Sequence, residues 1–340
     1  MKSRKKEALA LAASVLLLAL LLGLLTRLLT PKQHDFGSTW GQFLQEERDS
    51  VDVLFLGSSL VYCDVVPAVL WEETGLASYV MAGPEQTMPM TGYYLKEALR
   101  TQSPQAVFVE ITGMFYSRYT NYTKTNIGQM PWGWNRLSAT FREAEPEVRA
   151  GLLFPLLFYH DRWSGLTEDD FRVAFAGYDA DPLAGYTYLD SYCETDGIYD
   201  REIACDRENW ARNWDALEEI HRLCLERGIT PVFYVAPTLG RIPAEEMEPL
   251  QARIRELEGA RLLDCNAHFG EIGADESRDF HDTLHYNAAG AEKFTRFLAA
   301  WIGETLALQP QPGQDRELWQ SRLAHFEALS ARPLVPKEPA

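Results

Sequence analysis

The side chains needed for acyl transfer occur in two short motifs far apart in the chain. The first motif is Gly-Ser-Ser-Leu at residues 57–60, directly after an apolar run. In the second motif, Asp282 precedes His285 by three residues, just before a helical pattern. A serine nucleophile needs a histidine as general base and a carboxylate that orients the histidine. We therefore predict Ser59 as the nucleophile, His285 as the base and Asp282 as its orienting partner.

Alternating strand and helix patterns are predicted to position these motifs. Short apolar runs rich in β-branched and aromatic residues indicate five buried parallel strands: Val51–Leu56, Ala77–Met81, Ala106–Ile111, Pro231–Ala236 and Arg261–Asp264. Helical patterns lie between or after them, at about Pro67–Thr74, Met88–Thr101, Asn209–Arg227, Pro243–Leu257 and Ala288–Leu306, with Gly228 at a helix C-terminus and Pro243 in a first helical position. This order predicts an α/β fold with a doubly wound parallel sheet. Ligands bind outside the carboxyl ends of such strands, and Ser59 falls at one of those ends.

Between about Met114 and Glu208 the alternation stops. The stretch contains several Trp and Tyr residues and an apolar segment at 152–158, so it is too long and too apolar for a surface loop. We expect a mostly helical insertion, at about 114–208, that caps the carboxyl edge of the sheet. His160 in this insertion is either a substrate contact or a hydrogen-bonded structural histidine.

The first 30 residues have the pattern of a membrane anchor. Basic residues at positions 2, 4, 5 and 6 precede the apolar run Ala8–Leu29, which is about 33 Å long at 1.5 Å per residue and matches a bilayer core. The basic cluster predicts a cytoplasmic tail at 1–6, a transmembrane signal anchor at 7–30 and an extracytoplasmic location for everything after Pro31. A cleaved signal peptide is the alternative, although its apolar region is usually shorter.

The expected division of the remaining chain is one large domain followed by a short tail. The α/β domain with its insertion is predicted at 31–308. A Pro- and Gly-containing linker at 309–313 is followed by a helix at about Arg316–Leu329 and a Pro-rich end. Apolar residues make up 46% of the sequence, which is enough for a packed core.

The charge balance excludes nucleic acid as a partner. Beyond residue 32 the chain has 26 Lys and Arg residues against 48 Asp and Glu residues, a net charge of −22. Such a surface repels nucleic acids and other polyanions. An anionic glycopolymer substrate would therefore need a local basic groove.

The cysteines and acidic residues give no clear metal site. The five cysteines form no C-x-x-C pair, and Cys193 and Cys205 either close a small disulfide loop or remain free thiols. His281 and Asp279 lie close to the second motif, so a metal site formed by Asp279, His281, Asp282 and His285 is a competing hypothesis. Nothing else in the sequence supplies matching ligands, and we expect neither a metal nor a cofactor.

Together the two motifs resemble the SGNH/GDSL hydrolase superfamily. In that family a serine on the turn after the first strand meets a D-x-x-H pair near the C-terminus. Here Ser59 takes the place of the family's serine and Ser58 that of the preceding Asp. Asn287 and Gly290 continue the family's D-x-x-H-x-N-x-x-G pattern. The resemblance implies a flavodoxin-like sheet and a Ser-His-Asp triad, and it covers about 50–112 and 210–306.

The oxyanion hole is the incomplete part of this resemblance. The family uses the N–H of the nucleophile, a Gly after the second strand and an Asn after the third. Ser59 and Gly83 match the first two positions, but residues 110–114 read Glu-Ile-Thr-Gly-Met without the expected Gly-x-Asn-Asp. One missing donor costs about 2.7–4 kcal/mol of transition-state stabilisation. A backbone N–H near Gly113, or a side chain from the insertion, is expected to substitute.

This departure favours a membrane-anchored branch of the superfamily. The layout is similar to that of proteins for teichoic-acid D-alanylation and alginate acetylation in bacterial envelopes. The resemblance implies a serine esterase or O-acyltransferase that acts on acyl groups, most simply acetyl, of a cell-envelope glycan. A multi-span membrane O-acyltransferase is the protein partner that it implies. The alternative is a catalytically inactive envelope protein that keeps the fold to bind a polymer or such a partner.

Overall fold

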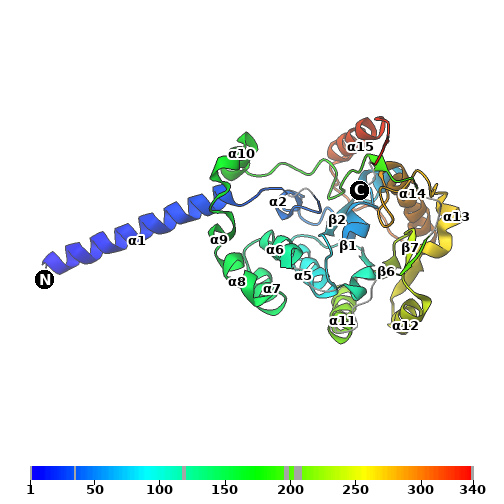
Figure 1. Ribbon diagram of the computed structural model, residues 1–340, viewed down its shortest axis with the longest axis horizontal. Coiled ribbons are helices and arrows are strands. Elements are labelled where there is room, and N and C mark those ends of the chain that lie inside the picture. Colours follow the sequence, from blue (N-terminus) through cyan, green and yellow to red (C-terminus); the bar gives the residue numbers. More distant parts are fainter. Residues whose placement is uncertain (1, 34–35, 117–119, 195–198, 203–208, 338–340) are drawn as a thin grey trace.

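The chain folds into a layered α/β domain with one long helix projecting from it (Figure 1). The computed structural model describes residues 2–33, 36–116, 120–194, 199–202 and 209–337. Its central sheet has five strands, all parallel, in the order β2-β1-β3-β6-β8. If these five strands are numbered 1 to 5 along the chain, their order in the sheet is 2-1-3-4-5, which is typical of a doubly wound sheet. In this order β1 lies between β2 and β3.

The five predicted strands all form, with shifts of one or two residues at their ends. They are β1 (Val53–Gly57), β2 (Ser78–Ala82), β3 (Ala106–Glu110), β6 (Thr230–Val235) and β8 (Arg261–Asp264). The first three are buried along their whole length, which explains why they read as continuous apolar runs. The α/β class and the parallel sheet predicted from the sequence are therefore confirmed.

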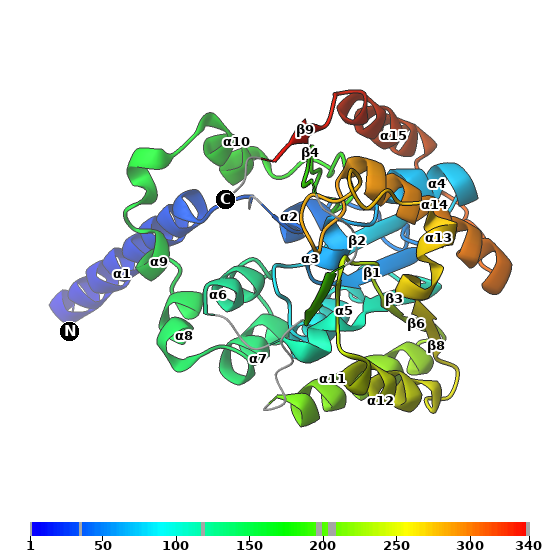
Figure 2. The ribbon, with the colours of Figure 1, turned by 45° about the vertical axis from the view of Figure 1, so that its right-hand side comes forward.

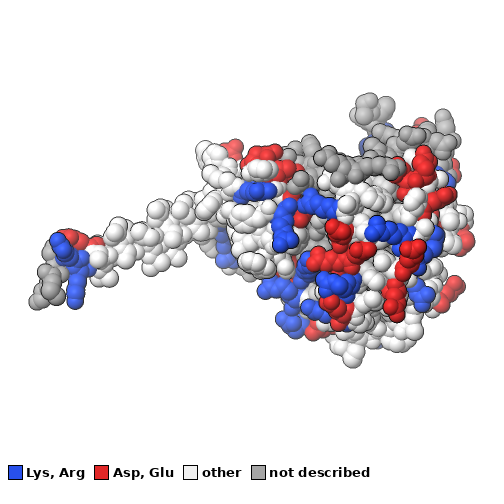
Figure 3. Space-filling model, turned by 90° about the horizontal axis from the view of Figure 1, so that it is seen from below, with Lys and Arg blue, Asp and Glu red and all other residues white. Residues whose placement is uncertain are grey.

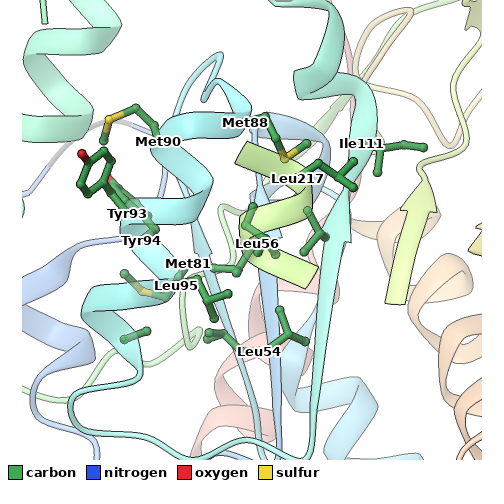
Figure 4. Packing of buried hydrophobic residues seen from close by; sticks show 14 of the residues in the cluster. Leu54, Leu56, Met81, Met88, Met90, Tyr93, Tyr94, Leu95, Ile111 and Leu217 are labelled. Carbon is green, nitrogen blue, oxygen red and sulfur yellow. The ribbon is translucent and has the colours of Figure 1, made fainter. Parts of the chain in front are cut away.

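Helices cover both faces of the sheet. On one face, side chains of β1 and β2 pack against α5 (Met88–Ala98) and α11 (Trp210–Glu226), and Figure 4 shows Leu54, Leu56 and Met81 meeting residues of those helices. α12 (Ala244–Arg255) closes the same face near β8. On the other face, Val53 and Phe55 pack towards α4 (Pro67–Thr74) and α14 (Ala288–Thr305).

The observed start of α12 differs from the predicted one by one residue. Pro243 is the N-cap of this helix, with an extended backbone, and not its first helical residue as predicted. The prediction was off by one position, a common error at helix ends. Gly228 follows the C-cap of α11 with a φ of +68°, as expected for a residue that terminates a helix.

The insertion is rich in helices. It contains α6 (Thr120–Gly128), α7 (Trp134–Arg142), α8 (Pro146–Leu153), α9 (Leu156–Tyr159) and α10 (Glu168–Ala176), with the 3-10 turns η1 (Ile111–Phe115) before them and η2 (Arg162–Gly165) among them. α6 reaches the turn after β2, but α9 and α10 lie beside the end of α1 (Figures 1 and 2). The insertion was expected to cap the carboxyl edge. α6 lies near that edge, whereas α7 packs on α5, and α9 and α10 contact α1.

The N-terminal helix α1 (Lys2–Leu29) has the length and composition to cross a membrane. Most of its apolar side chains are exposed, and Figure 3 shows it as an uncharged rod between a charged tip and the domain. A soluble core helix of this kind would be buried in the protein. This helix therefore supports a membrane anchor or a signal sequence.

The C-terminal segment returns onto the domain. α15 (Arg316–Ser330) packs on α4, where the rings of Trp319 and Trp71 stack at 6.2 Å. β9 (Val335–Pro336) then pairs with β4 (Ser191–Tyr192) of the insertion. The remaining elements are short: α2 (Trp40–Phe43), α3 (Ser59–Tyr62), β5 (Tyr199–Glu202), β7 (Gly240–Arg241), η3 (Cys265–His268) and α13 (Phe269–Ile272).

Candidate active site

Ser59 begins α3 immediately after β1, at the carboxyl edge of the sheet. The turn needs glycine at position 57, because Gly57 has a φ of +152° and a Cβ there would lie 2.9 Å from the Cβ of Glu110. The backbone N–H of Ser59 has no acceptor among the described hydrogen bonds. The turn thus presents both the hydroxyl and the N–H of Ser59 at the strand end.

Ser59, His285 and Asp282 come together although Ser59 and His285 are 226 positions apart, and we call these three residues the triad. His285 Nε2 lies 2.7 Å from the Ser59 Oγ. His285 Nδ1 lies 2.9 Å from each carboxylate oxygen of Asp282. This arrangement lets the Ser59 hydroxyl donate to Nε2 while Nδ1–H donates to Asp282, the tautomer that a general base requires.

The D-x-x-H spacing works through a tight local turn. Asp282 Oδ1 accepts hydrogen bonds from the backbone N–H groups of Leu284 (2.9 Å) and His285 (3.0 Å), so the carboxylate folds back under the ring. Burial alone would raise the pKa of Asp282, but its hydrogen bonds with His285 and with these N–H groups hold that pKa well below the usual range. Asp282 is therefore a stable anion that fixes the imidazole.

Asn287 supports this turn and does not face the serine. It is fully buried and caps α14, with its Oδ1 accepting from the N–H groups of Ala289 (3.1 Å) and Gly290 (3.3 Å). Its Nδ2 donates to the carbonyl of Arg278 (2.6 Å). The supporting position predicted for Asn287 is thus that of a helix cap which ties the loop before the D-x-x-H turn to α14.

Two buried carboxyl groups lie behind the triad, and the sequence analysis did not single them out. Asp64 accepts from the backbone N–H of Tyr286 (3.0 Å), next to the catalytic candidate His285. Glu110 accepts from the N–H of Thr112 (2.9 Å) at the end of β3. Burial raises the pKa of Asp64 well above its usual value and that of Glu110 to about 7. Glu110 could have been identified from the sequence by its position at the end of the third predicted strand.

The two predicted oxyanion donors differ in whether their backbone N–H already has an acceptor. The N–H of Ser59 is free to donate, whereas the N–H of Gly83 already donates to the carbonyl of Gly57 at 3.3 Å. Gly83 is close-packed, because a Cβ there would lie 2.2 Å from Oδ1 of Asn126. Asn126 belongs to α6 of the insertion, is buried, and has no partner for that Oδ1 among the described residues. The side-chain amide of Asn126, from the insertion, therefore lies next to Gly83, the glycine expected to help form the oxyanion hole.

Two tyrosine hydroxyls also approach the serine turn. The Tyr116 hydroxyl is 3.4 Å from the Oγ of Ser58, and Tyr62 is close enough to share a hydrogen bond with the side chain of Ser59. Ser58 is itself fully buried, so its side chain supports the turn from within. Tyr116 directly follows η1, where the family pattern is missing, and it is a hydroxyl donor that the sequence analysis did not identify.

Several other predicted residues lie apart from the triad. His160 is exposed at the end of α9, beside α1, and no described contact links it to Ser59. Asp279 pairs with Lys293 (2.6 Å) and His281 with the hydroxyl of Ser191 (2.7 Å), so neither side chain joins Asp282 and His285 as a ligand set. The described residues contain no group of three or more His, Cys, Asp or Glu side chains arranged to hold a metal ion.

One of the two cysteines considered for a disulfide lies outside the described part of the chain. Cys193 is a free thiol in the structure, and Cys205 is not among the described residues. Cys63, close after Ser59, is a buried free thiol whose pKa is raised by burial, so it is unsuited to act as a nucleophile.

A cavity of about 650 Å³ lies at the same edge of the sheet. Its lining includes Thr112, Ala236, Thr238 and Asn266. Leu239, the residue after Thr238, donates its backbone N–H to the carbonyl of Thr283 in the D-x-x-H turn (3.1 Å). The cavity has space for a small organic group near the strand ends.

The fold and the site thus define an α/β protein with a hydrogen-bonded serine, histidine and aspartate at the carboxyl edge of a parallel sheet. The sequence matches no protein-family model. It also matches none of the curated proteins with which it was compared.

Proposed function

We propose that this protein is a serine esterase or O-acyltransferase that forms an acyl-Ser59 intermediate. The observation that carries the proposal is the chain of hydrogen bonds from Ser59 Oγ to His285 Nε2 (2.7 Å) and from His285 Nδ1 to Asp282 (2.9 Å). Each contact lies within the reach required for proton transfer between a nucleophile and a base. The resemblance of the two motifs to those of SGNH/GDSL hydrolases supports the same chemistry.

The reaction follows from the roles of the three residues. As Ser59 Oγ attacks the ester carbonyl, His285 Nε2 takes its proton and Asp282 stabilises the imidazolium. The tetrahedral intermediate collapses when His285 gives that proton to the leaving alcohol, which leaves an acyl group on Ser59. Water or a sugar hydroxyl then gives its proton to His285 as it attacks the acyl carbonyl, and His285 passes this proton to Ser59 Oγ when the bond between Oγ and the acyl carbon breaks. Hydrolysis and transfer use the same residues.

The developing oxyanion needs donors in addition to these residues. The free N–H of Ser59 is the first donor in the proposed site. The hydroxyl of Tyr116, which reaches the turn from the start of the insertion, is the second in place of the family's missing Asn. Tyrosine hydroxyls serve as oxyanion donors in other enzymes. The N–H of Gly83 contributes only if substrate displaces it from the Gly57 carbonyl.

The setting supports a substrate in the cell envelope. A helix that can cross a membrane precedes the domain, and its basic N-terminal residues favour a cytoplasmic N-terminus with the domain outside. The proposed substrates are acyl esters, most simply acetyl esters, of an envelope glycan. The anchor favours transfer over hydrolysis because it keeps the domain close to a membrane acyl donor, such as a multi-span O-acyltransferase.

Labelling with a fluorophosphonate probe tests the chemistry directly. The full chain in detergent should label, and the label should map to Ser59 by peptide mass spectrometry. Ser59→Ala should abolish labelling and reduce hydrolysis of 4-nitrophenyl acetate by at least 10³-fold. The matched control is Ser103→Ala, which changes an exposed serine away from the triad and should leave both signals unchanged.

The alternative is a non-catalytic protein that binds an envelope polymer or an acyltransferase partner. Its structural support is the Gly83 N–H that is already bonded within the chain. If wild type and Ser59→Ala are equally unlabelled and equally inactive, the catalytic proposal is wrong and this alternative takes its place.

A further inference from the structure

A large cavity lies far from the triad, between the C-terminal end of α1 and the insertion. Its volume is about 920 Å³. α1 contributes Leu22 and Arg27 to its wall, and α8 to α10 contribute most of the opposite side. Both ribbon views place α9 and α10 beside this end of α1 (Figures 1 and 2). The cavity therefore lies where the membrane-crossing helix meets the domain.

The walls of this cavity are mainly apolar and partly open to the surroundings. Residues at its rim expose large side chains, with exposed fractions of 66% for Phe154, 59% for Leu157 and 55% for Trp132. Phe175 of α10, which contacts α1, is similarly exposed. Exposed aromatic side chains beside a membrane-crossing helix are typical of the membrane interface. The apolar surface of α1 thus continues into the insertion.

The charged residues of the cavity all have the same sign. Arg27, Lys32 and Arg136 line it, and no Asp or Glu is among its described lining residues. This is unusual in a chain with a net charge of −17. The Nζ of Lys32 donates to the main-chain carbonyl of Thr30 (2.6 Å), and the nearby carboxylate of Asp170 is already bound twice by Arg162 at 2.8 Å.

Arg136 is the residue that points most clearly to a ligand. Its side chain is only 5% exposed, and it donates to the carbonyls of Gly128, Met130 and Leu152. Its guanidinium lies 4.1 Å from the ring centroid of Trp132, which is a favourable but neutral contact. Among the described residues, its Nε–H has no hydrogen-bond partner and no carboxylate forms an ion pair with it. Burial lowers the pKa of Arg136 to about 10, which still leaves it charged at neutral pH. A buried cation without an anion is costly unless something outside the chain neutralises it.

We propose that this cavity binds one anionic phospholipid from the leaflet next to the domain. The phosphate lies beside Arg27, Lys32 and Arg136, and an acyl chain lies along the apolar wall formed by residues such as Leu22, Phe154 and Leu157. The bound lipid joins α1 to the insertion and fixes how the domain sits on the membrane. No chemistry at Ser59 is required for this.

A lipid fits these observations better than a free anion or a peptide. A free anion would leave the apolar wall and the exposed rim without an occupant. An acidic peptide could meet the cations, but the cavity opens beside a helix whose surroundings are hydrocarbon in a membrane. Phospholipid is the anionic amphiphile present at that depth.

Thermal unfolding of the full chain in detergent, with added lipid, tests the proposal. Phosphatidylglycerol should raise the Tm in a saturable manner, and phosphatidylcholine with the same acyl chains should need at least a tenfold higher concentration. Native mass spectrometry should detect one retained phosphatidylglycerol. The double variant Arg27→Gln/Lys32→Gln keeps Arg136 and its structural hydrogen bonds and should lose at least tenfold in apparent affinity.

Matched controls separate the possible outcomes. Arg48→Gln/Arg142→Gln removes two exposed cations outside the cavity and should bind lipid as the wild type does. Ser59→Ala should also bind normally, so this proposal and the catalytic proposal can fail independently. The lipid site is wrong if the two lipids act equally, if inorganic phosphate alone gives the full Tm shift, if neither lipid has an effect, or if the cavity variant keeps its preference for phosphatidylglycerol.

Discussion

The carboxyl edge of the sheet and the cavity beside α1 both remove charged side chains from water, but they compensate the charges differently. At the sheet edge, Asp282 is bound by His285 and by two backbone N–H groups, so each of its contacts comes from the chain. In the cavity, the described contacts of Arg136 are all with neutral groups, namely main-chain carbonyls and the ring of Trp132, and its Nε–H has no partner among the described residues. The charge of Asp282 is therefore compensated within the chain, whereas that of Arg136 calls for an external anion.

The reason for this difference is chemical. A buried carboxyl group can take up a proton and become neutral, which is how burial acts on Asp64 and Glu110 behind the triad. An arginine cannot lose its proton in this way at physiological pH. A buried arginine therefore needs a permanent anion, and elsewhere in the domain Arg322 has one in the carboxylate of Glu46. Arg136 is the case in which the chain supplies none among the described residues.

Substitution of Asp282 should have the largest effect. Asp282→Asn keeps the size of the side chain but no longer holds His285 in the tautomer that accepts a proton from Ser59. We expect kcat/KM for ester hydrolysis to fall by about 10⁴-fold, or about 5.5 kcal/mol. Cleavage of 4-nitrophenyl acetate by the full chain measures this. A loss of less than tenfold would mean that Asp282 does not orient a catalytic base.

The two buried arginines offer a smaller and more direct comparison. Arg322→Met leaves the carboxylate of Glu46 buried without its cation and should cost about 3–5 kcal/mol of unfolding free energy at pH 8. Because protonation of Glu46 relieves this penalty, the cost should shrink at pH 5. Arg136→Met removes hydrogen bonds to carbonyls and should cost about 1–3 kcal/mol at either pH.

Urea unfolding of the full chain in lipid-free detergent, at pH 5 and pH 8, measures both variants. The two arginines are compared by how the loss of unfolding free energy in each variant changes between pH 5 and pH 8, and not by the size of that loss. If Arg136→Met showed the same loss of stability between pH 5 and pH 8 as Arg322→Met, a carboxylate would have to neutralise Arg136, and the cavity would need no external anion.

Much of the fold could be predicted from the sequence because its signals are local. Buried parallel strands are continuous apolar runs, and the helix Pro67–Thr74 has the same ends in the prediction and in the structure. The strands and helices needed only periodicity and the rules of α/β topology. The convergence of Ser59 and His285 was predicted instead from the chemistry of their residue types and from the resemblance of the two motifs to a known family, because His285 does not lie at a strand end.

The contacts that determine the rest are long-range, and no local pattern encodes them. Asn126 comes from the insertion to lie against Gly83, and the C-terminal helix that follows a linker-like segment returns to pack on α4. Arg136 reads in the sequence as an ordinary surface arginine of an amphipathic helix. Only its burial at 5% exposure, and the lack of an acid nearby, distinguish it as part of a binding site.

Glu110 tests how the sheet edge treats a buried carboxyl group that, unlike Asp282, has no positively charged or imidazole partner among its described contacts. Its Oε1 accepts from Thr112, whereas Oε2 lies near the backbone of Ala236 without a well-formed hydrogen bond. Burial raises its pKa from 4.5 to about 7, so the folded protein binds a proton that the unfolded chain releases between those pH values. Stability contributed by this protonated state is full below about pH 4.5 and is lost as the pH rises through 7, by about 3 kcal/mol in all.

Glu110→Gln should remove this loss, because the amide stays neutral at every pH. We expect the variant to gain about 3 kcal/mol relative to the wild type between pH 4.5 and pH 8, in urea unfolding of the full chain. Glu147→Gln, at an exposed position, is the control and should run parallel to the wild type. If Glu110→Gln and the wild type also ran parallel, Glu110 would be ionised and paired in the folded state. The sheet edge would then compensate this charge within the chain, as it does for Asp282, and the cavity would be the one of the two regions with an uncompensated charge.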